Sequence, residues 1–524
     1  MPDPGPAANL APDADPRAER GRSATVPATR GYIDVNAAFG PDHGTAATGG
    51  RPLAALVDER RDHGIRLSLA SSLIATAHQA TGNRLAAEAA ADPGHGLAPV
   101  AVIGARRTGD AGRIVAAAEA AGAVGYRLQG WDGSTPPSTA LGEVLDAVAR
   151  TRRPLLVAIG RDGGASRIGE ATASLGIPVI LLGAHYNHIV DDLAAAVRFA
   201  HLHLETSALA HFRAVETAVN AIGAERILFG SDSPARAAAS PIGAILAAAI
   251  APDAKRAILA GNACRLFGLP SGPVDLRPDP GPARAFDVHA HFGPFDLDVP
   301  DVDDAALPGA IAIGSTSRVV ASSAIAIFGD PVRGNAQAVA AAGHPDGALA
   351  YVVVDPADLE TSRAQLRRHL SGSGVVGVKV HAEWSATPTA SRSMADLFDL
   401  LAGFGRPVKI HNAGDGWDEA LGAIARRHRT LPIIVAHGGL GTPSIEGARL
   451  AAANDNVHLE WSSSFAHLPT VRAALAVAGP DRLLWGSDGP LLEPSFVLGT
   501  YRDAGLPAEA LDRVFWTNGE DLFR

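Results

Sequence analysis

The chain has 524 residues, and because single hydrophobic cores stop growing at roughly 250 to 300 residues, its length predicts two domains. Its formal net charge is −10 without any run of clustered Lys and Arg, which argues against nucleic acid and anionic membrane surfaces as partners and favours small molecules. A single cysteine, Cys264, excludes an intrachain disulfide and cysteine metal clusters, so we expect a buried thiol in a cytoplasmic protein.

Composition divides the chain into segments. Residues 1–29 carry prolines and acids but no apolar core of signal-peptide length, so we expect a disordered tail. Residues 30–268 and 285–524 are the two expected domains, and the proline-rich stretch 269–284 between them predicts a stiff, extended linker. No stretch reaches about 18 apolar residues free of charge, so no membrane span is expected.

The two domains are copies of one another, because separate motifs repeat in order at nearly one spacing. The separation is 253 residues for "IDVNAAFGP" and "FDVHAHFGP" and for "RPLLVAIG" and "RPVKIHNA". It is 256 residues for "RILFGSDSP" and "RLLWGSDGP" and for "NACRLF" and "NGEDLF". Chance could supply one such match, but this ordered set indicates duplication of a whole domain.

Within each copy, short apolar runs alternate with longer segments of helical period. In the second copy the runs include "ALAYVVV", "GVVGVKV", "LPIIVA" and "NVHLEW", while "SMADLFDLLAGFG" is typical of a helix. Buried parallel strands are continuously apolar, so this alternation predicts an α/β fold of two tandem (β/α)8 TIM-barrel-like domains. A doubly wound open sheet is the alternative, although no Gly-rich dinucleotide turn follows the first strand.

Polar side chains end the predicted strands of the second copy, where a barrel carries its active site. His289 and His291, two positions apart in the first strand, point to one side and suit a common metal ion. Later strand ends carry Lys379, His381, His411, His437 and Asp488. Converging imidazoles and a carboxylate predict one divalent ion, with Zn²⁺ favoured over Mn²⁺ or Fe²⁺.

These motifs resemble the amidohydrolase superfamily, and within it the amidohydrolase-related branch that includes aminocarboxymuconate semialdehyde decarboxylase. The resemblance covers nearly all of 285–524 through "DVHAHFG", "KIHNAG", "VAHGG", "WGSDGP" and "NGEDLF". It implies that His437 lies beside the reacting water. It also implies a single metal whose ligands are His289, His291, His411 and Asp488.

The resemblance leaves two interpretations of Lys379. Superfamily members with two metals bridge them through a carbamylated lysine after the fourth strand, whereas the amidohydrolase-related branch usually works with one metal. Lys379 is then either that bridge or a partner of a substrate carboxylate. The residues expected to contact the substrate are Lys379, His381, Glu383, Trp384, Asn412 and Trp461.

The first copy lacks most of these residues. Asn36 and Ala38 replace the paired histidines, and Ala158 replaces His411. The partner of His437 depends on the alignment and is either Gly183 or His185, while Asp232 keeps the place of Asp488. One carboxylate and at most one imidazole make a poor metal site, so we expect the first barrel to be non-catalytic. We expect it to serve as scaffold or lid in an intramolecular pseudo-dimer, and the alternative is that its emptied pocket binds a regulator or part of a large substrate. The two-barrel chain could also form a homo-oligomer.

Three functions follow for the second copy. The favoured one is metal-dependent hydrolysis of a C–N or C–O bond in a small organic molecule, in which Asp488 accepts a proton from water and His437 orients it. The second is non-oxidative decarboxylation of an unsaturated or aromatic carboxylic acid, with protonation by His437. The third is a non-catalytic binding or scaffold protein. The sequence does not identify the substrate.

Overall fold

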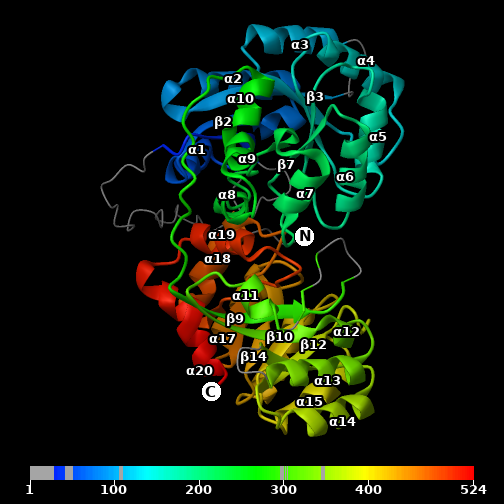
Figure 1. The fold of residues 1–524 in the computed structure, drawn as a ribbon, viewed down its shortest axis with the longest axis vertical. Coiled ribbons are helices and arrows are strands. Elements are labelled where there is room, and N and C mark those ends of the chain that lie inside the picture. The colour runs from blue at the N-terminus through cyan, green and yellow to red at the C-terminus, as the bar shows by residue number, and fades with distance from the viewer. Residues whose placement is uncertain are drawn as a thin grey trace, which may run out of the picture.

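The computed structural model describes residues 29–41, 51–104, 110–295, 300, 302–303, 305–343 and 348–524. The tail expected at 1–29 lies outside these residues except for its last one. Two eight-stranded parallel sheets, each interleaved with helices, form two tandem (β/α)8 barrels (Figure 1), as the strand and helix patterns predict.

The first sheet keeps chain order from β1 to β8, and every neighbouring pair is parallel. Its ends close, because the Val35 N–H donates to the Phe229 carbonyl at 3.0 Å and the Ala38 N–H to the Ser233 carbonyl at 3.2 Å. The strands are β1 (Tyr32–Phe39), β2 (Ile65–Ser72), β3 (Leu97–Gly104), β4 (Gly125–Gln129), β5 (Leu155–Ala158), β6 (Val179–Leu182), β7 (Leu202–Glu205) and β8 (Ile227–Leu228).

The second sheet repeats this order from β9 to β16. Equivalent bonds close it: the Val288 N–H donates to the Trp485 carbonyl at 3.0 Å, and the His291 N–H to the Gly489 carbonyl at 2.8 Å. The strands are β9 (Arg284–Phe292), β10 (Thr316–Ser323), β11 (Leu349–Val354), β12 (Val375–His381), β13 (Val408–His411), β14 (Ile433–Val435), β15 (Val457–Glu460) and β16 (Leu483–Leu484).

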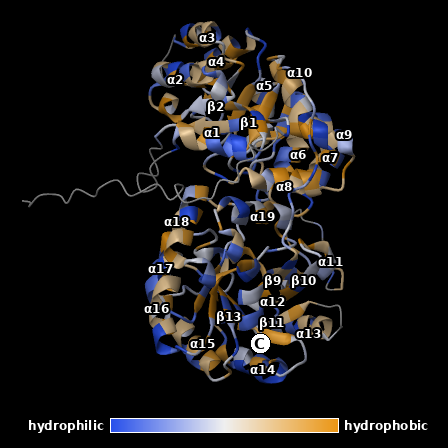
Figure 2. Cartoon of the chain, turned by 90° about the vertical axis from the view of Figure 1, so that its left-hand side faces the viewer, coloured by the Kyte–Doolittle hydropathy of each residue, from blue (hydrophilic) through white to orange (hydrophobic). Residues whose placement is uncertain are grey.

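Helices surround each barrel and cover the apolar strands, which lie inside (Figure 2). In the first half they are α1 (Leu53–Asp62), α2 (Gln79–Ala91), α3 (Ala111–Ala120), α4 (Thr139–Ala149), α5 (Gly164–Thr172), α6 (Ile189–Arg198), α7 (Ala214–Ile222), α8 (Ala239–Ala247), α9 (Pro252–Arg256) and α10 (Asn262–Phe267). In the second half they are α11 (Leu307–Ala310), α12 (Ala324–Ile327), α13 (Pro331–Ala342), α14 (Leu359–His369), α15 (Arg392–Ala402), α16 (Trp417–Arg427), α17 (Ile445–Ala453), α18 (Leu468–Ala478), α19 (Pro494–Asp503) and α20 (Asn518–Leu522). None of the described helices is long and apolar enough to cross a membrane.

The segment between the barrels contains no helix or strand from residue 269 to 283 and runs along both of them (Figure 1). The Tyr32 hydroxyl of the first barrel donates to the Asp275 carbonyl at 2.7 Å. From the second barrel, the Arg502 guanidinium lies 3.7 Å from the Asp279 carboxylate. Cys264 is buried, as expected of a core thiol.

The two barrels pack directly on one another through α8 and α19 (Figure 1). A Cβ atom on Gly499 would come within 2.2 Å of the Ser240 nitrogen, so only glycine permits this approach of the two helices. His211 and Leu492 pair in an antiparallel bridge across the same contact.

A buried charge cluster joins the barrels beside these helices. The His63 imidazole lies 3.1 Å from the Asp503 carboxylate, and the Arg472 guanidinium lies 2.7 Å from Glu59. Burial opposes protonation of His63, but the carboxylates of Asp503 and Glu59 outweigh it and raise the pKa to about 9. The carboxylates of Glu59 and Asp503 thus face the cations His63 and Arg472, which balances the cluster without a metal ion.

The His63 contact predicts a pH-dependent stability. Because its folded pKa of about 9 lies above its unfolded value of 6.5, its contribution is complete below pH 6.5 and is lost as pH rises through 9. The thermal midpoint of the full chain should fall over this window, and His63→Gln should flatten that fall. The control is His78→Gln, at an exposed histidine before α2. Parallel curves for His63→Gln and the unmodified protein would show that this contact does not stabilise the fold.

Candidate metal centre

Three of the predicted ligands meet at the C-terminal end of the second barrel. His289 and His291 extend from β9 to the same side, and Asp488 follows β16 with a positive φ of 58° that turns its carboxylate inward. Asp488 Oδ1 lies 3.4 Å from His289 Nε2 and 3.1 Å from His291 Nε2, and the two Nε2 atoms are 3.2 Å apart. All three side chains are buried.

The Nδ1 atoms of His289 and His291, on the side of each ring away from Asp488, also have polar partners. His289 Nδ1 lies 2.7 Å from Glu460 Oε1, and His291 Nδ1 lies 2.9 Å from the Ser322 hydroxyl. Glu460 is an acceptor, so it places the proton of His289 on Nδ1 and leaves a lone pair on Nε2. Burial lowers the pKa of both imidazoles, which keeps them in the neutral form that metals bind.

This donor set fits a divalent ion. Tetrahedral Zn²⁺ with bonds of about 2.0–2.1 Å places its ligand atoms roughly 3.3 Å from one another. The separations among His289, His291 and Asp488 are 3.1–3.4 Å. Burial opposes ionisation of Asp488, but its contacts with His289 and His291 lower the pKa of its carboxyl. Two neutral imidazoles and a carboxylate are suitable ligands for Zn²⁺, Mn²⁺ and Fe²⁺.

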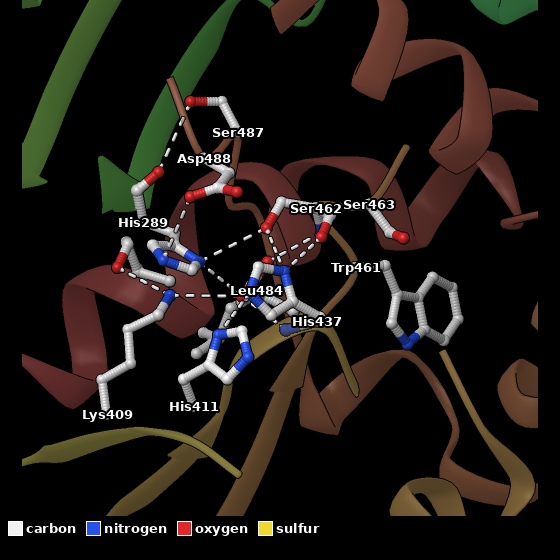
Figure 3. A network of polar contacts seen from close by, with 12 residues as sticks. His289, Lys409, His411, His437, Trp461, Ser462, Ser463, Leu484, Ser487 and Asp488 are labelled. Atoms are coloured by element: carbon white, nitrogen blue, oxygen red, sulfur yellow. Dashed lines mark hydrogen bonds and ion pairs between the residues drawn. The ribbon is translucent and has the colours of Figure 1, made fainter. Parts of the chain in front are cut away.

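His411 and His437 form an adjoining pair (Figure 3). His437 Nε2 lies 3.1 Å from His411 Nδ1, and the His437 ring centre lies 5.0 Å from that of His289. His411 Nε2 lies 3.1 Å from the Glu383 carboxylate, so both of its ring nitrogens already have partners. The role of His411 as a metal ligand therefore stays a prediction.

The remaining predicted site residues lie at different depths. Lys379 is buried with Nζ 3.0 Å from His289 Nε2, and burial lowers its pKa to about 7. His381 stacks on His411 with ring centres 4.1 Å apart, whereas Trp384 is 61% exposed. Asn412 is buried and accepts a bond from Thr389 at 3.3 Å. Trp461 is only 1% exposed, and its indole lies apart from the histidines (Figure 3).

Glu460 was not among the site residues predicted from the sequence, although it contacts three residues of the site. Its carboxylate accepts the His437 backbone N–H at 2.8 Å and lies 3.3 Å from Lys409 Nζ, besides holding His289. Burial opposes its ionisation, but Lys409 and His437 lower the pKa to about 2. The signal was present, since "LHLE" at 202–205 and "VHLE" at 457–460 repeat at nearly the same spacing as the other motifs.

The structure of the first barrel shows which of its residues, Gly183 or His185, is equivalent to His437. The Gly183 N–H donates to Glu205 Oε1 at 3.0 Å, just as the His437 N–H donates to Glu460. Gly183 and His437 also share a positive φ, 84° and 60°. Gly183 is therefore the structural equivalent of His437, so His289, His291, His411 and His437 are all replaced in the first barrel.

Arginines occupy the corresponding end of the first barrel. Arg127 takes the place of Lys379 and donates to Asn36, and Arg51 lies 3.1 Å from Asp232 Oδ1. Among the residues that the structure describes, no three metal-ligating side chains of this barrel converge there. Its surviving carboxylate is thus balanced by a guanidinium.

A family model described as amidohydrolase matches residues 47–269 and 286–524, so the chain belongs to that family through both of its halves. A comparison with curated proteins returns no match.

Similar solved structures each correspond to about one barrel of this chain. They include 2,6-dihydroxybenzoate decarboxylase from Rhizobium (16% identity, 46% of this chain and 99% of that one, TM-score 0.36). Another is an amidohydrolase from Burkholderia multivorans with bound HEPES (15% identity, 46% of this chain and 99% of that one, TM-score 0.39). A third is 5-carboxyvanillate decarboxylase from Novosphingobium aromaticivorans with bound manganese (13% identity, 45% of this chain and 97% of that one, TM-score 0.36). At these identities the likeness concerns the fold alone.

The position of Glu460 predicts a measurable loss of metal affinity. Glu460→Gln removes the charge that fixes the tautomer of His289, and loss of such a supporting group typically weakens metal binding by about 10- to 100-fold. Competition with a chelator of known affinity measures this change. Glu205→Gln alters the equivalent glutamate in the first barrel and should leave metal affinity unchanged. Equal affinities for the two variants would refute the supporting role of Glu460.

Proposed function

We propose that the second barrel is a metal-dependent hydrolase of a C–N or C–O bond in a small organic substrate. The observation that carries this proposal is the convergence of His289 Nε2, His291 Nε2 and Asp488 Oδ1 within 3.1–3.4 Å. A bound divalent ion, for which we propose Zn²⁺ ahead of Mn²⁺ or Fe²⁺, supplies Lewis acidity that lowers the pKa of water toward about 7.

Asp488 and His437 suit complementary roles in hydrolysis. The Asp488 carboxylate stays ionised and is placed to accept a proton from water and pass it to the leaving group. His437 Nδ1 lies 2.5 Å from the Ser462 carbonyl, so the proton of the ring is on Nδ1 and Nε2 is an acceptor. Burial lowers the His437 pKa to about 4, which makes this residue better suited to orienting water than to protonating a product.

Decarboxylation of an unsaturated or aromatic acid is the second candidate, and two observations favour it. Lys379 places a buried amine beside His289, where it could pair with a substrate carboxylate. Phe328 lies between Phe295 and Trp384, with ring centres at 6.0 and 4.7 Å, and such rings suit a planar substrate.

A substrate panel in ¹⁸O-labelled water separates the candidates. Hydrolysis of an ester, lactone or amide by the metal-loaded chain inserts one labelled oxygen into the product. Decarboxylation of an aromatic acid releases carbon dioxide and leaves the organic product unlabelled. Failure to convert either class with metal bound would instead support a binding or scaffold protein.

Asp488→Asn should separate chemistry from metal binding. The histidines still offer ligands, but turnover should fall at least about 100-fold because the proton acceptor is lost. The matched change in the first barrel, Asp232→Asn, should leave turnover unchanged. Steady-state rates normalised to bound metal measure both. Near-normal turnover by metal-loaded Asp488→Asn would contradict the assigned role.

A further inference from the structure

The C-terminal end of the first barrel carries a guanidinium where the second barrel carries an amine. Arg127 on β4 and Lys379 on β12 occupy equivalent positions in the two sheets. Arg127 donates to the side-chain oxygen of Asn36, the residue that replaces His289, whereas Lys379 Nζ lies 3.0 Å from His289 Nε2. The Arg127 guanidinium therefore points to the place that the candidate metal ligands occupy in the second barrel.

Arg51 and Arg236 bring two further guanidiniums to the same end of the first barrel. Arg51 Nη1 lies 3.1 Å from Asp232 Oδ1, and Arg236 Nε lies 3.8 Å from Asp232 Oδ2. The Asp232 backbone N–H donates to the Asn36 carbonyl at 2.7 Å, which joins this group to the partner of Arg127. Two of the three guanidiniums thus share one carboxylate.

The two buried carboxyl groups at this end do not balance the third guanidinium. Burial raises the pKa of Asp34 to about 7 and also raises the pKa of Glu205, which favours their neutral forms. Arg127 donates to a neutral amide instead, and its buried Nε atom has no hydrogen-bond partner among the residues that the structure describes. Within this described part of the chain, the charge of Arg127 therefore has no directly bonded carboxylate.

Small residues open this end of the barrel to solvent. Ala158, the last residue of β5, and Gly183, directly after β6, stand at the positions of two lost histidines. Ala158 is exposed and Gly183 is partly exposed, although the strand residues before them are buried. Ala158 lies two positions after Leu156, the β5 partner of Arg127, so it faces the same side of the sheet. The space beside Arg127, which is itself partly exposed, is thus accessible to water.

We propose that the first barrel binds an oxyanion of a small molecule, a carboxylate or a phosphate group, at Arg127, with Arg51 and Arg236 supplying further positive charge. A guanidinium presents N–H donors in a planar fork that matches two oxygens of such a group. The anion would give Arg127 the counter-charge that Asn36 does not supply. The proposal is independent of the reaction in the second barrel, and it gives the first barrel a binding role of its own.

Titration calorimetry of the full chain with inorganic phosphate and with malonate tests the proposal. The chain carries His289→Ala and His291→Ala, so that oxyanions bound to a metal in the second barrel add no heat. In this background, Arg127→Met should weaken binding by about 10- to 100-fold, the usual worth of a charge-assisted hydrogen bond. Arg127→Lys should restore part of the affinity, because it keeps the charge but loses the fork. The bound anion should also raise the thermal midpoint of the chain that retains Arg127, but not that of Arg127→Met.

Arg150→Met is the matched control. It removes the same charge from an exposed arginine directly after α4, at the opposite end of the barrel, and should leave both affinities unchanged. Binding of only one probe, lost in Arg127→Met, would support the proposal and identify the oxyanion as phosphate or carboxylate. Equal affinities of Arg127→Met and Arg150→Met for both probes would overturn it, as would failure of both probes to bind the chain that retains Arg127.

Discussion

Buried negative charge at the C-terminal end of each barrel is the constraint on which the rest of the site depends. Both copies retain the same carboxylates, Asp34, Glu205 and Asp232 in the first and Asp287, Glu460 and Asp488 in the second. Asp34 and Asp287 keep identical partners, because each accepts bonds from the serine that precedes Asp232 or Asp488. Carboxylates removed from water are costly unless they are paired or protonated, so each barrel must supply compensation.

The two barrels meet that requirement differently. In the second, Lys409 lies against Glu460 and keeps it ionised, and Asp488 lies 3.1–3.4 Å from the imidazoles of His289 and His291, which a divalent cation would join to it. In the first, Leu156 occupies the position of Lys409. Burial raises the pKa of Glu205, which favours the neutral form of its carboxyl. Arg51 neutralises Asp232 directly. A fixed guanidinium thus lies beside the first barrel's carboxylate, where the second barrel offers candidate ligands for a divalent cation.

Much of the fold was predictable because buried parallel strands are continuously apolar and repeat at a nearly constant spacing in the two halves. His289, His291 and Asp488 were predictable for the same reason, since they end strands whose order fixes their position. Glu460 was harder to identify, because one glutamate at a strand end looks like an exposed residue until its partner Glu205 is compared. The contact of His185 with Ser464 was beyond prediction, because no local pattern specifies which loops of two packed barrels meet.

The pairing of the barrels gives the duplication a physical reason. The α8 and α19 helices approach closely enough to require Gly499, and the same contact brings residues 185–186 to the segment that holds His289 and His437. Replacing the histidines in one copy removes its metal ligands without disturbing this contact. The second copy keeps its candidate ligands and a contact with its neighbour at Ser464.

The most direct test of the account is the number of divalent ions bound per chain after metal loading and removal of excess ion. The account predicts one equivalent, which disappears in the double variant His289→Ala, His291→Ala and persists in the double variant Asn36→Ala, Asp232→Ala. Two equivalents in the unmodified protein, or one equivalent that survives loss of both histidines, would contradict it.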